Sequence, residues 1–547
     1  MEGGRLGYRC PAEPVDTYVK KGGDVADTDA DSETFASAPV LVTEIGGADD
    51  TVVLRYNADQ PYELALVGPR TRTAWVTPER EGAELSATLS LLLDEWGTGL
   101  VSLPTDDYAV VARTPEAGDE LPVLVDRQLW RELPLSLDTG SHLILPGALE
   151  GGRLQLRVAP GENRNTVGSY VRRRLRDEHY PAAREMPLLD VALFETFHGR
   201  AAGDNPGPLC AELARRDSGL DLVFSVVDRS VSVPEGARSV VRWSTEWFEL
   251  LGRARYFVTN APLPPFFRKR EGQVFLHTWH GSPLKRIAHD RVSQDFANWH
   301  HRRQLLVARD GWDYLISQSP FCTEALRSAF LYDGEMLELG YPRNDLLSSP
   351  EAEEVRRRTR EHLGIAPEAR VILYAPTWRD NYRSGRVFDK IVFLETAEVV
   401  RQVPDSVVLV RGHYNSMEDA DVQGTDRRVL DVTRYPDISD LYLAADALVT
   451  DYSSVFFDFV LTDKPMYFLA PDLAEYRDQN RGFYLDYHDT VPGPVAVTTQ
   501  QVVDALLGPD EYVEVRKRFR AEYAPWDDGH ASERIVDVLL RHQESAV

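Results

Sequence analysis

Cysteine is scarce in this sequence, and long apolar runs are missing from it. The 547 residues include three cysteines, Cys10, Cys210 and Cys322, which lie far apart and form no CxxC pattern. Such a set argues against a disulfide framework and a structural zinc site, and it fits a reducing compartment. No stretch approaches the roughly 20 consecutive apolar residues that a membrane-spanning helix needs. The N-terminal MEGGRLGYRC lacks the apolar core of a signal peptide. We therefore expect a cytoplasmic chain that is at most peripherally attached to the inner face of the cell membrane.

Basic side chains are also fewer than acidic ones. The chain has 61 Lys and Arg against 87 Asp and Glu, for a net charge of −26. This balance opposes binding to nucleic acid, and we expect no nucleic-acid partner. Residues 252–303 depart from it, because ten Lys and Arg stand there against three acidic residues. This segment is the candidate for attracting a polyanion or a membrane surface, and a scattered solvated face is the alternative interpretation.

Several common catalytic motifs are absent as well. The sequence contains no Walker A motif, GxSxG, HExxH or protein-kinase set. No DxD-like pair follows a convincing strand, which weakens the case for an obligatory divalent metal. We expect no cofactor and no set of metal ligands, and the question of metal dependence stays open.

The length predicts about three domains, because one hydrophobic core stops growing well below this size. Residues 1–36 are polar and acidic and are expected to be a disordered tail. Residues 37–165 contain short runs of alternating apolar and polar residues separated by Gly, Pro and Asp, which predict a β-rich accessory domain. Within it, 88–96 could form one or two helical turns. A basic helix is expected at 167–180.

From about residue 187, apolar runs of four to seven residues alternate with longer amphipathic segments, as in βαβ units. The strands expected before a break near 348–353 are 188–194, 221–227, 255–258, 274–278, 314–317 and 336–339. Those expected after it are 371–375, 406–411, 429–431, 447–450 and 465–469. We predict an α/β protein with two Rossmann-like domains, 166–350 and 351–547, facing a cleft and preceded by the all-β domain. Ligands then bind at the carboxyl ends of the strands.

The segment HTWHGSPLKR, residues 277–286, is the first candidate for chemistry. His280 follows an apolar strand, and Ser282-Pro283 is expected to open a helix. Histidine is suited to take a proton from a hydroxyl near pH 7. Lys285 and Arg286 would then meet phosphate from the first helical turns. A buried structural histidine beside a solvated basic face is an equally good interpretation from the residues alone.

Two further turns follow strands in the second half. APTWRD, residues 375–380, places Thr377 and Arg379 after a strand, where a hydroxyl and backbone N–H groups can face a phosphate. RGH, residues 411–413, places Arg411 and His413 after another strand. Two histidines on opposite sides of a cleft could divide the work of proton transfer and charge stabilisation. Each turn is a weak signal by itself.

The segment VTDYSSVFFD, residues 449–458, is the clearest phosphate site in the sequence. Asp451 ends a strand, and Ser453 and Ser454 stand where a helix N-cap is expected. Serine hydroxyls, free N–H groups and the helix dipole together favour an anion. An ordinary N-cap explains the same residues, because Ser is among the commonest ways to start any helix.

Together these segments resemble the CDP-glycerol glycerophosphotransferase family, the teichoic acid primases and polymerases with a GT-B fold. The resemblance runs from about residue 189 to 507. The matching segments are FETFHG and GDNP (194–206), HTWHGSPLK (277–285), SQSPFCTEAL (317–326), LGYPRND (339–345), YAPTWRDN (374–381), RGH (411–413), YPDISDLYLAADALVTDYSSVFFDF (435–459), DKPMYF (463–468) and RGFYLDY (481–487).

The resemblance implies a reaction in which the acceptor's terminal hydroxyl attacks the β-phosphate of CDP-glycerol, or of another CDP-polyol, and CMP leaves. The implied acceptor is a lipid-linked anionic polymer of the teichoic or capsular kind. His280 resembles the family's general base and His413 its second essential histidine. Thr377, Ser453 and Ser454 match positions that hold the pyrophosphate and nucleotide, and Asp451 matches an acid near the donor. Arg379 and Arg411 are weaker candidates for phosphate contact.

Two other functions compete with this one. A GT-B glycosyltransferase or epimerase that uses a UDP-sugar would share the fold and the serine-rich turn, but not HGSPLK, PTWR and RGH. A non-catalytic envelope-binding protein would depend on the β-rich domain, and the presence of both His280 and His413 argues against it.

Overall fold

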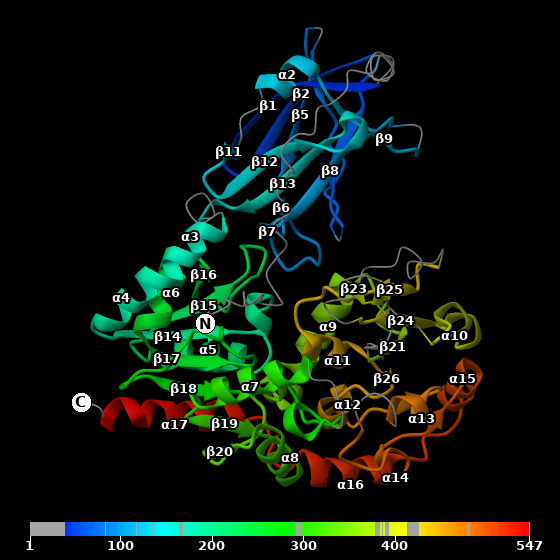
Figure 1. The fold of residues 1–547 in the computed structure, drawn as a ribbon. Helices are drawn as coiled ribbons and strands as arrows, with labels where there is room; N and C mark the ends of the chain where they lie inside the picture. Colours follow the sequence, from blue (N-terminus) through cyan, green and yellow to red (C-terminus); the bar gives the residue numbers. More distant parts are fainter. Residues whose placement is uncertain are drawn as a thin grey trace, which may run out of the picture.

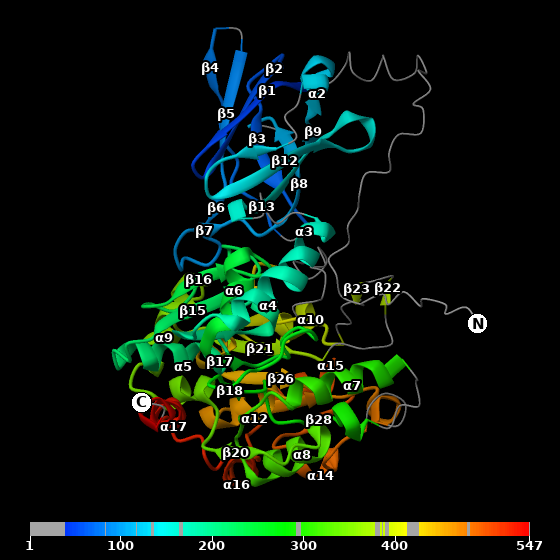
Figure 2. The same cartoon turned by 60° about the vertical axis from the view of Figure 1, so that its left-hand side comes forward.

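The structure, a computed structural model, describes residues 39–545 apart from gaps at 70, 83, 116–117, 133–135, 163–167, 292–296, 378–382, 385–386, 389–392, 413–425 and 478–481. The expected acidic tail, 1–36, lies outside the described residues. From its N-terminal end the described chain forms a β-sandwich, a helical connector and two α/β lobes (Figure 1). Figures 1 and 2 both show the sandwich at one end of the molecule and the two lobes packed together at the other.

The β-sandwich contains two mainly antiparallel sheets that share one apolar core. Buried and half-buried side chains alternate along β2 and β8, as expected for strands with one face on a core. In order, the first sheet contains β10 (Leu124–Val125), β1 (Val40–Ala48), β2 (Thr51–Ala58), β5 (Glu84–Ser90) and β4 (Glu79–Glu81). The second contains β11 (Leu137–Asp138), β12 (His142–Ala148), β13 (Leu154–Pro160), β8 (Asp106–Arg113) and β3 (Glu63–Val67), with β9 (Leu121–Pro122) on β8.

The prediction of helical turns at 88–96 is wrong. The segment continues β5 and then forms β6 (Leu92–Leu93), which pairs with β7 (Val101–Ser102). Leu85, Ala87 and Leu89 are buried in alternation, so the period of two along the strand prevails over the local helical preference. A short helix, α2 (Arg127–Glu132), lies later in the sandwich.

The connector between the sandwich and the lobes is helical, which confirms the basic helix expected at 167–180. It contains α3 (Ser169–Arg174), one π-helical turn, η3 (Leu175–His179), and α4 (Tyr180–Glu185). Tyr180 is buried, and its ring meets that of Phe266 at a centroid distance of 5.5 Å. This contact anchors the connector on the first lobe.

The first lobe (the N-lobe) is built on a parallel sheet of seven strands. Five consecutive side chains of β14 are buried, because helices cover both faces of such a sheet. In order, the strands are β16 (Arg238–Val241), β15 (Asp221–Val226), β14 (Leu189–Glu195), β17 (Ala254–Thr259), β18 (Val274–His277), β19 (Tyr314–Ser317) and β20 (Glu335–Glu338). The helices are α5 (Pro206–Arg215), α6 (Thr245–Arg253), α7 (Ala297–Arg309) and α8 (Pro320–Phe330).

The second lobe (the C-lobe) has a parallel sheet of six strands. In order, they are β25 (Val429–Asp431), β24 (Ser406–Val410), β21 (Arg370–Ala375), β26 (Ala447–Thr450), β27 (Met466–Leu469) and β28 (Val495–Ala496). The helices around it are α9 (Ala352–His362), α10 (Thr396–Gln402), α11 (Ile438–Ala444), α12 (Val455–Phe459), α13 (Leu473–Glu475), α14 (Tyr487–Thr490), α15 (Thr499–Leu507) and α16 (Val513–Tyr523). The predicted strands are confirmed to within two residues, and the short β16 and β28 were not foreseen.

The last helix, α17 (Ala531–Ser545), does not pack on the lobe that precedes it. Ile535, Val536 and Leu539 belong to the apolar core of the N-lobe. The Asp345 carboxylate accepts hydrogen bonds from the first N–H groups of this helix, at 2.9 and 2.7 Å. The expected second domain, 351–547, therefore ends before α17, because the apolar face of this helix packs on the N-lobe. No described helix is both long and apolar enough to cross a membrane.

Candidate active site

One large cleft, about 3410 Å³ in volume, is lined by residues of the sandwich and of both lobes. Six of the predicted site residues line it, namely His280, Lys285, Thr377, Arg411, Ser453 and Ser454. Arg286 and Asp451 lie behind its lining. His413 and Arg379 lie outside the described residues. The cleft therefore brings together turns that are more than 170 residues apart in the sequence.

Each parallel sheet has a switch point that opens into this cleft. In the N-lobe the chain passes from β14 to β15 on one side and continues to β17 on the other. In the C-lobe the same reversal separates β21 from β26. Loops diverge where strand order reverses, and the crevice left at the carboxyl ends is where ligands bind in such sheets. Thr377 follows β21 and Ser453 follows β26, so the predicted donor residues flank the C-lobe switch point.

His280 lies at the floor of the cleft, three residues beyond β18. Its Nδ1 is 3.0 Å from the carbonyl oxygen of Asn260. A carbonyl only accepts, so Nδ1 carries the proton and Nε2 keeps a lone pair that can take another. His280 is exposed to the cleft. Desolvation by the protein around it lowers its pKa from 6.5, while the Asn260 bond and Asp204 oppose the shift. His280 therefore has the tautomer and charge of a general base at neutral pH.

A chain of buried polar groups connects His280 to the C-lobe, and sequence reasoning did not assign these residues. Asn260 donates through Nδ2 to Asp204 at 2.7 Å. The other Asp204 oxygen accepts from Arg343 at 2.9 Å, and Arg343 also donates to Asp458 of α12 at 2.7 Å. All four side chains are buried, or nearly so, and paired, which is the condition for burying charge. Asp204, Arg343 and Asp458 had one sequence signal, their membership of the segments GDNP, YPRND and SSVFFDF, and Asn260 had none.

The two lobes meet closely at Gly281. This residue has a φ of +139°, which side chains rarely adopt. A Cβ placed on it would lie 3.2 Å from both the Arg343 guanidinium and the Ser454 hydroxyl. Glycine suits this position because of its φ and because a Cβ would crowd the ends of these two side chains. Gly281, the residue after His280 in the N-lobe, therefore lies next to Ser454 of the C-lobe.

The turns of the C-lobe switch point are tied to each other by Asp451. Its carboxylate accepts a hydrogen bond from the backbone N–H of Thr377 at 2.7 Å. Ser454 is the N-cap residue of α12, but its hydroxyl makes no capping hydrogen bond. Ser453 and Ser454 are both half-buried at the cleft wall. The predicted N-cap position of Ser454 is thus confirmed, but its backbone is already helical and its side chain does not cap the helix.

Lys285 and Arg286 are placed by backbone pairing rather than by a helix. Ser282-Pro283 opens no helix, and the chain instead pairs with the C-lobe through an isolated bridge between Lys285 and Phe483. The Lys285 ammonium is 6.0 Å from the ring centroid of Tyr476, and it reaches the cleft. The Arg286 guanidinium lies 5.5 Å from the centroid of Tyr484. The expected first helical turn is wrong, since residues 284–286 find hydrogen-bond partners in residues 482–484 of the other lobe.

Arg411 binds protein carbonyls at the edge of the cleft. One nitrogen donates to the carbonyl oxygens of Val432 at 3.0 Å and Tyr435 at 2.5 Å. Burial lowers the pKa of Arg411, and nearby Asp437 opposes the shift. Arg411 thereby holds the segment that leads into α11.

The neighbouring His277 is structural. It is fully buried, stacks on Trp312 at a centroid distance of 3.9 Å, and lies 3.3 Å from the Thr259 hydroxyl. Burial shifts its pKa well below 6.5. Within the described ranges, no group of three or more His, Cys, Asp or Glu side chains is arranged to hold a metal ion.

Comparison with known proteins gives concordant matches over both lobes. The teichoic acid glycerol-phosphate transferase of Staphylococcus aureus is 36% identical over 374 residues, which cover 65% of this chain and 94% of that protein. The teichoic acid poly(glycerol phosphate) polymerase of Bacillus subtilis is 34% identical over 374 residues, 66% of this chain. The chain spans half the length of that polymerase, since the match covers 50% of it.

A solved structure shares the fold of the lobes. The wall teichoic acid polymerase TagF, in a histidine-to-asparagine variant soaked with CDPG, superimposes with a TM-score of 0.64 and 31% identity. The match covers 71% of this chain and 98% of that chain. The family model described as CDP-glycerol:poly(glycerophosphate) glycerophosphotransferase matches residues 179–541, so the whole β-sandwich lies outside it. With both lobes matched, the chain is a transferase that belongs to the CDP-glycerol:poly(glycerophosphate) glycerophosphotransferase family.

Proposed function

We propose that this chain transfers glycerol phosphate, or a related polyol phosphate, from CDP-glycerol to the terminal hydroxyl of a teichoic-acid-like or capsular polymer. The observation that carries the proposal is the meeting of His280 with the serine turn of the C-lobe switch point, across Gly281. A base from one lobe then faces an anion site on the other. The names of the relatives and the CDPG soaked into TagF support the choice of donor and acceptor.

In this mechanism the acceptor hydroxyl gives its proton to Nε2 of His280 as its oxygen attacks the β-phosphorus of CDP-glycerol. A new P–O bond forms to the acceptor, the P–O bond to CMP breaks, and CMP carries away the electron pair. Thr377, Ser453 and Ser454 hold the pyrophosphate at the C-lobe switch point, and Asp451 positions Thr377. His413 and Arg379 stay predictions for the same donor site, and Lys285 and Arg286 for the acceptor.

The proposal gives each part of the chain a role. The N-lobe binds the acceptor and the C-lobe binds the CDP-donor. The acceptor is carried on a lipid, and the enzyme meets it at the inner face of the cell membrane. The sandwich is an accessory part that walls one end of the cleft.

The test is CMP release from CDP-glycerol in the presence of a glycerol-phosphate-primed lipid acceptor, with CDP-ribitol and a UDP-sugar in parallel. We expect acceptor-dependent release with a CDP-polyol, and a loss of at least about 10²-fold in His280→Ala, as for removal of a general base. His277→Asn, next to the site but structural, controls for disturbance of the strand. Turnover of the UDP-sugar alone would mean that the chemistry is that of a glycosyltransferase or epimerase.

A further inference from the structure

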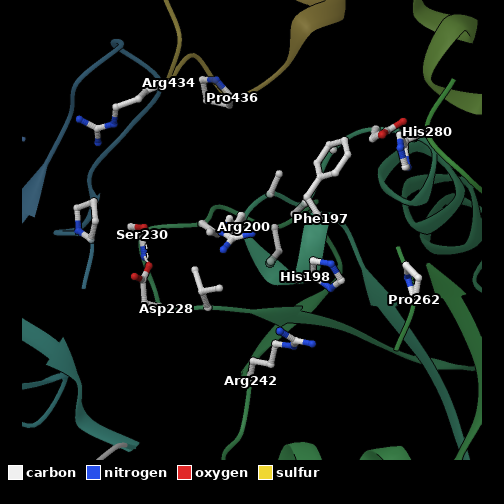
Figure 3. Close-up of a pocket in the computed structure, with 18 of the residues that line it drawn as sticks. Phe197, His198, Arg200, Asp228, Ser230, Arg242, Pro262, His280, Arg434 and Pro436 are labelled. Carbon is white, nitrogen blue, oxygen red and sulfur yellow. Dashed lines mark hydrogen bonds between the residues drawn. The ribbon is translucent and has the colours of Figure 1, made fainter. Parts of the chain in front are cut away.

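The cleft includes a crevice over the carboxyl ends of β14, β15 and β16 in the N-lobe, on one side of the switch point between β14 and β17. The loops that follow these strands line it. Figure 3 shows His198, Arg200 and Arg242 gathered around this pocket, with Pro262 on one side and His280 beyond Phe197. The Phe197 and His280 rings lie 5.9 Å apart, so this crevice adjoins the proposed base.

The crevice is cationic in a chain whose net charge is −26. Arg200 is exposed, while the Arg242 side chain is 14% and the His198 side chain 40% exposed. Burial lowers the pKa of His198 below 6.5. Glu195 opposes this shift, and nearby Arg242, Arg200 and His280 add to it. His198 is therefore neutral near pH 7, and the positive charge of the crevice comes from the two arginines. The nearest acidic groups at the cleft wall are occupied: Asp204 binds Arg343 and Asn260, and Asp228 binds the hydroxyl of Ser230 and the N–H of Thr105.

One buried carboxylate lies behind Arg242 and His198. Glu195, the last residue of β14, is 1% exposed. One of its oxygens is 3.3 Å from Nε of Arg242 and accepts from the Ser225 hydroxyl at 2.7 Å. Its other oxygen is 4.0 Å from Nδ1 of His198. A single buried carboxylate therefore lies behind both Arg242 and His198. The Arg242 guanidinium also packs on the rings of Trp243 and Trp247, 4.9 and 5.7 Å from their centroids, and lines the cleft.

The loop that carries His198 is held in an unusual conformation. Phe197 and His198 have φ values of +46° and +59°, two consecutive non-glycine residues in the left-handed region. The Phe197 N–H donates to the Asn260 side chain at 2.8 Å, which anchors the turn to β17. Backbone conformations of this kind persist where the surrounding structure holds them, and they gather at ligand sites.

We propose that this crevice of His198, Arg200 and Arg242 binds a phosphodiester of the acceptor polymer, one unit back from the hydroxyl that reacts. The inference rests on the proposed function and deepens it on the acceptor side. In a poly(polyol phosphate) the unit that bears the terminal hydroxyl is attached through a phosphodiester, so an anion necessarily follows the reacting end. With the hydroxyl at His280, that anion falls on the N-lobe side of the cleft, away from the serine turn. Arg guanidinium groups bind such phosphate oxygens through paired N–H donors.

The test measures binding of a short glycerol-phosphate oligomer and of CDP-glycerol by calorimetry, and the KM for the oligomer at saturating donor. In Arg242→Gln we expect the Kd and KM for the oligomer to rise at least about tenfold, the loss for one hydrogen bond to a charged group. The Kd for CDP-glycerol should stay within about twofold, because the donor binds the other lobe. Arg255→Gln is the matched control, since Arg255 pairs with Asp190 at the opposite end of β17.

Arg200→Gln keeps the test decisive if Arg242→Gln fails to fold, because Arg200 is exposed. Unchanged oligomer affinity in a folded variant of each arginine would overturn the subsite. Displacement of the oligomer by an equal concentration of inorganic phosphate would also overturn it, by assigning the crevice to free phosphate. Oligomer binding without any CMP release from CDP-glycerol would instead count against the proposed function and leave the subsite standing.

Discussion

At the scale of single residues, hydrogen bonds to the backbone fix the charge and tautomer of the group that would react. The Asn260 carbonyl holds the proton of His280 on Nδ1, and Asp204 and Arg343 lie on the far side of the same network. Desolvation disfavours the charged imidazolium, so the pKa of His280 falls below 6.5. The base form therefore persists as the medium becomes mildly acidic.

This shift predicts the pH dependence of the transfer reaction. Protonation of His280 removes the base, so kcat/KM should fall on the acid side with a midpoint below pH 6.5 and be level just above it. In Asp204→Asn the midpoint should move further to acid, because the Asp204 carboxylate raises the pKa of His280. The measurement is a pH profile of acceptor-dependent CMP release. A midpoint above 6.5, or a profile unchanged in His280→Ala, would exclude His280 as the titrating base.

At the scale of elements, the donor side of the site depends on short turns that follow two neighbouring strands. β21 and β26 pair through most of their length, and Asp451 extends the connection beyond the last residues of both. Thr377 and Ser453, two of the proposed donor residues, thus closely follow strands of the sheet, which suits the precise placement of a phosphate.

Asp451→Ala tests this arrangement. The substitution leaves the buried N–H of Thr377 without its acceptor, which costs about 1–3 kcal/mol. We expect a lower Tm and weaker binding of CDP-glycerol, measured by thermal unfolding and calorimetry. Asp451→Asn keeps an oxygen acceptor in place and should recover most of both. Full donor affinity in Asp451→Ala would show that the turn holds its shape without the carboxylate.

At the scale of the whole molecule, the sandwich reaches both lobes. Glu95 pairs with Arg434 of the C-lobe at 3.0 Å, and the Trp96 and Tyr435 rings lie 5.5 Å apart. A few residues later, the Thr105 N–H donates to Asp228 of the N-lobe at 2.7 Å. The sandwich therefore connects the two lobes across the cleft at two places, the loop between β6 and β7 and the residue before β8. These contacts add to the one at Gly281.

Trp96→Ala should loosen this connection without unfolding the lobes. An aromatic pair contributes about 0.5–1.5 kcal/mol beyond its buried area. We expect faster amide hydrogen exchange in residues 94–105 and 433–437, and unchanged exchange in β14 and β21. Trp130→Ala, on α2 at the outside of the sandwich and 50% exposed, is the matched control. Equal protection in both variants would mean that the ring contact does not hold the sandwich in place.

The sequence by itself determined the strands of the two sheets except β16 and β28, the connector helix, and the turns with His280, Thr377 and Ser453. These features depend on neighbours along the chain. Apolar runs bounded by turn residues predict strands without knowledge of the elements that pack against them. The carboxyl ends of parallel strands meet at one edge of the sheet, which places the turns together. The family resemblance also depended on short segments in a fixed order.

Only the tertiary structure decided which charges meet. Arg343 finds Asp204 at a separation of 139 residues and Asp458 at 115, and no local pattern marks such pairs. Three other contacts also join distant parts of the chain without a local pattern. Lys285 forms a bridge with Phe483, α17 packs on the N-lobe, and Glu195 lies behind Arg242. Buried polar groups take partners wherever the packing of distant elements brings them, because leaving them unpaired away from water costs free energy whatever their place in the sequence.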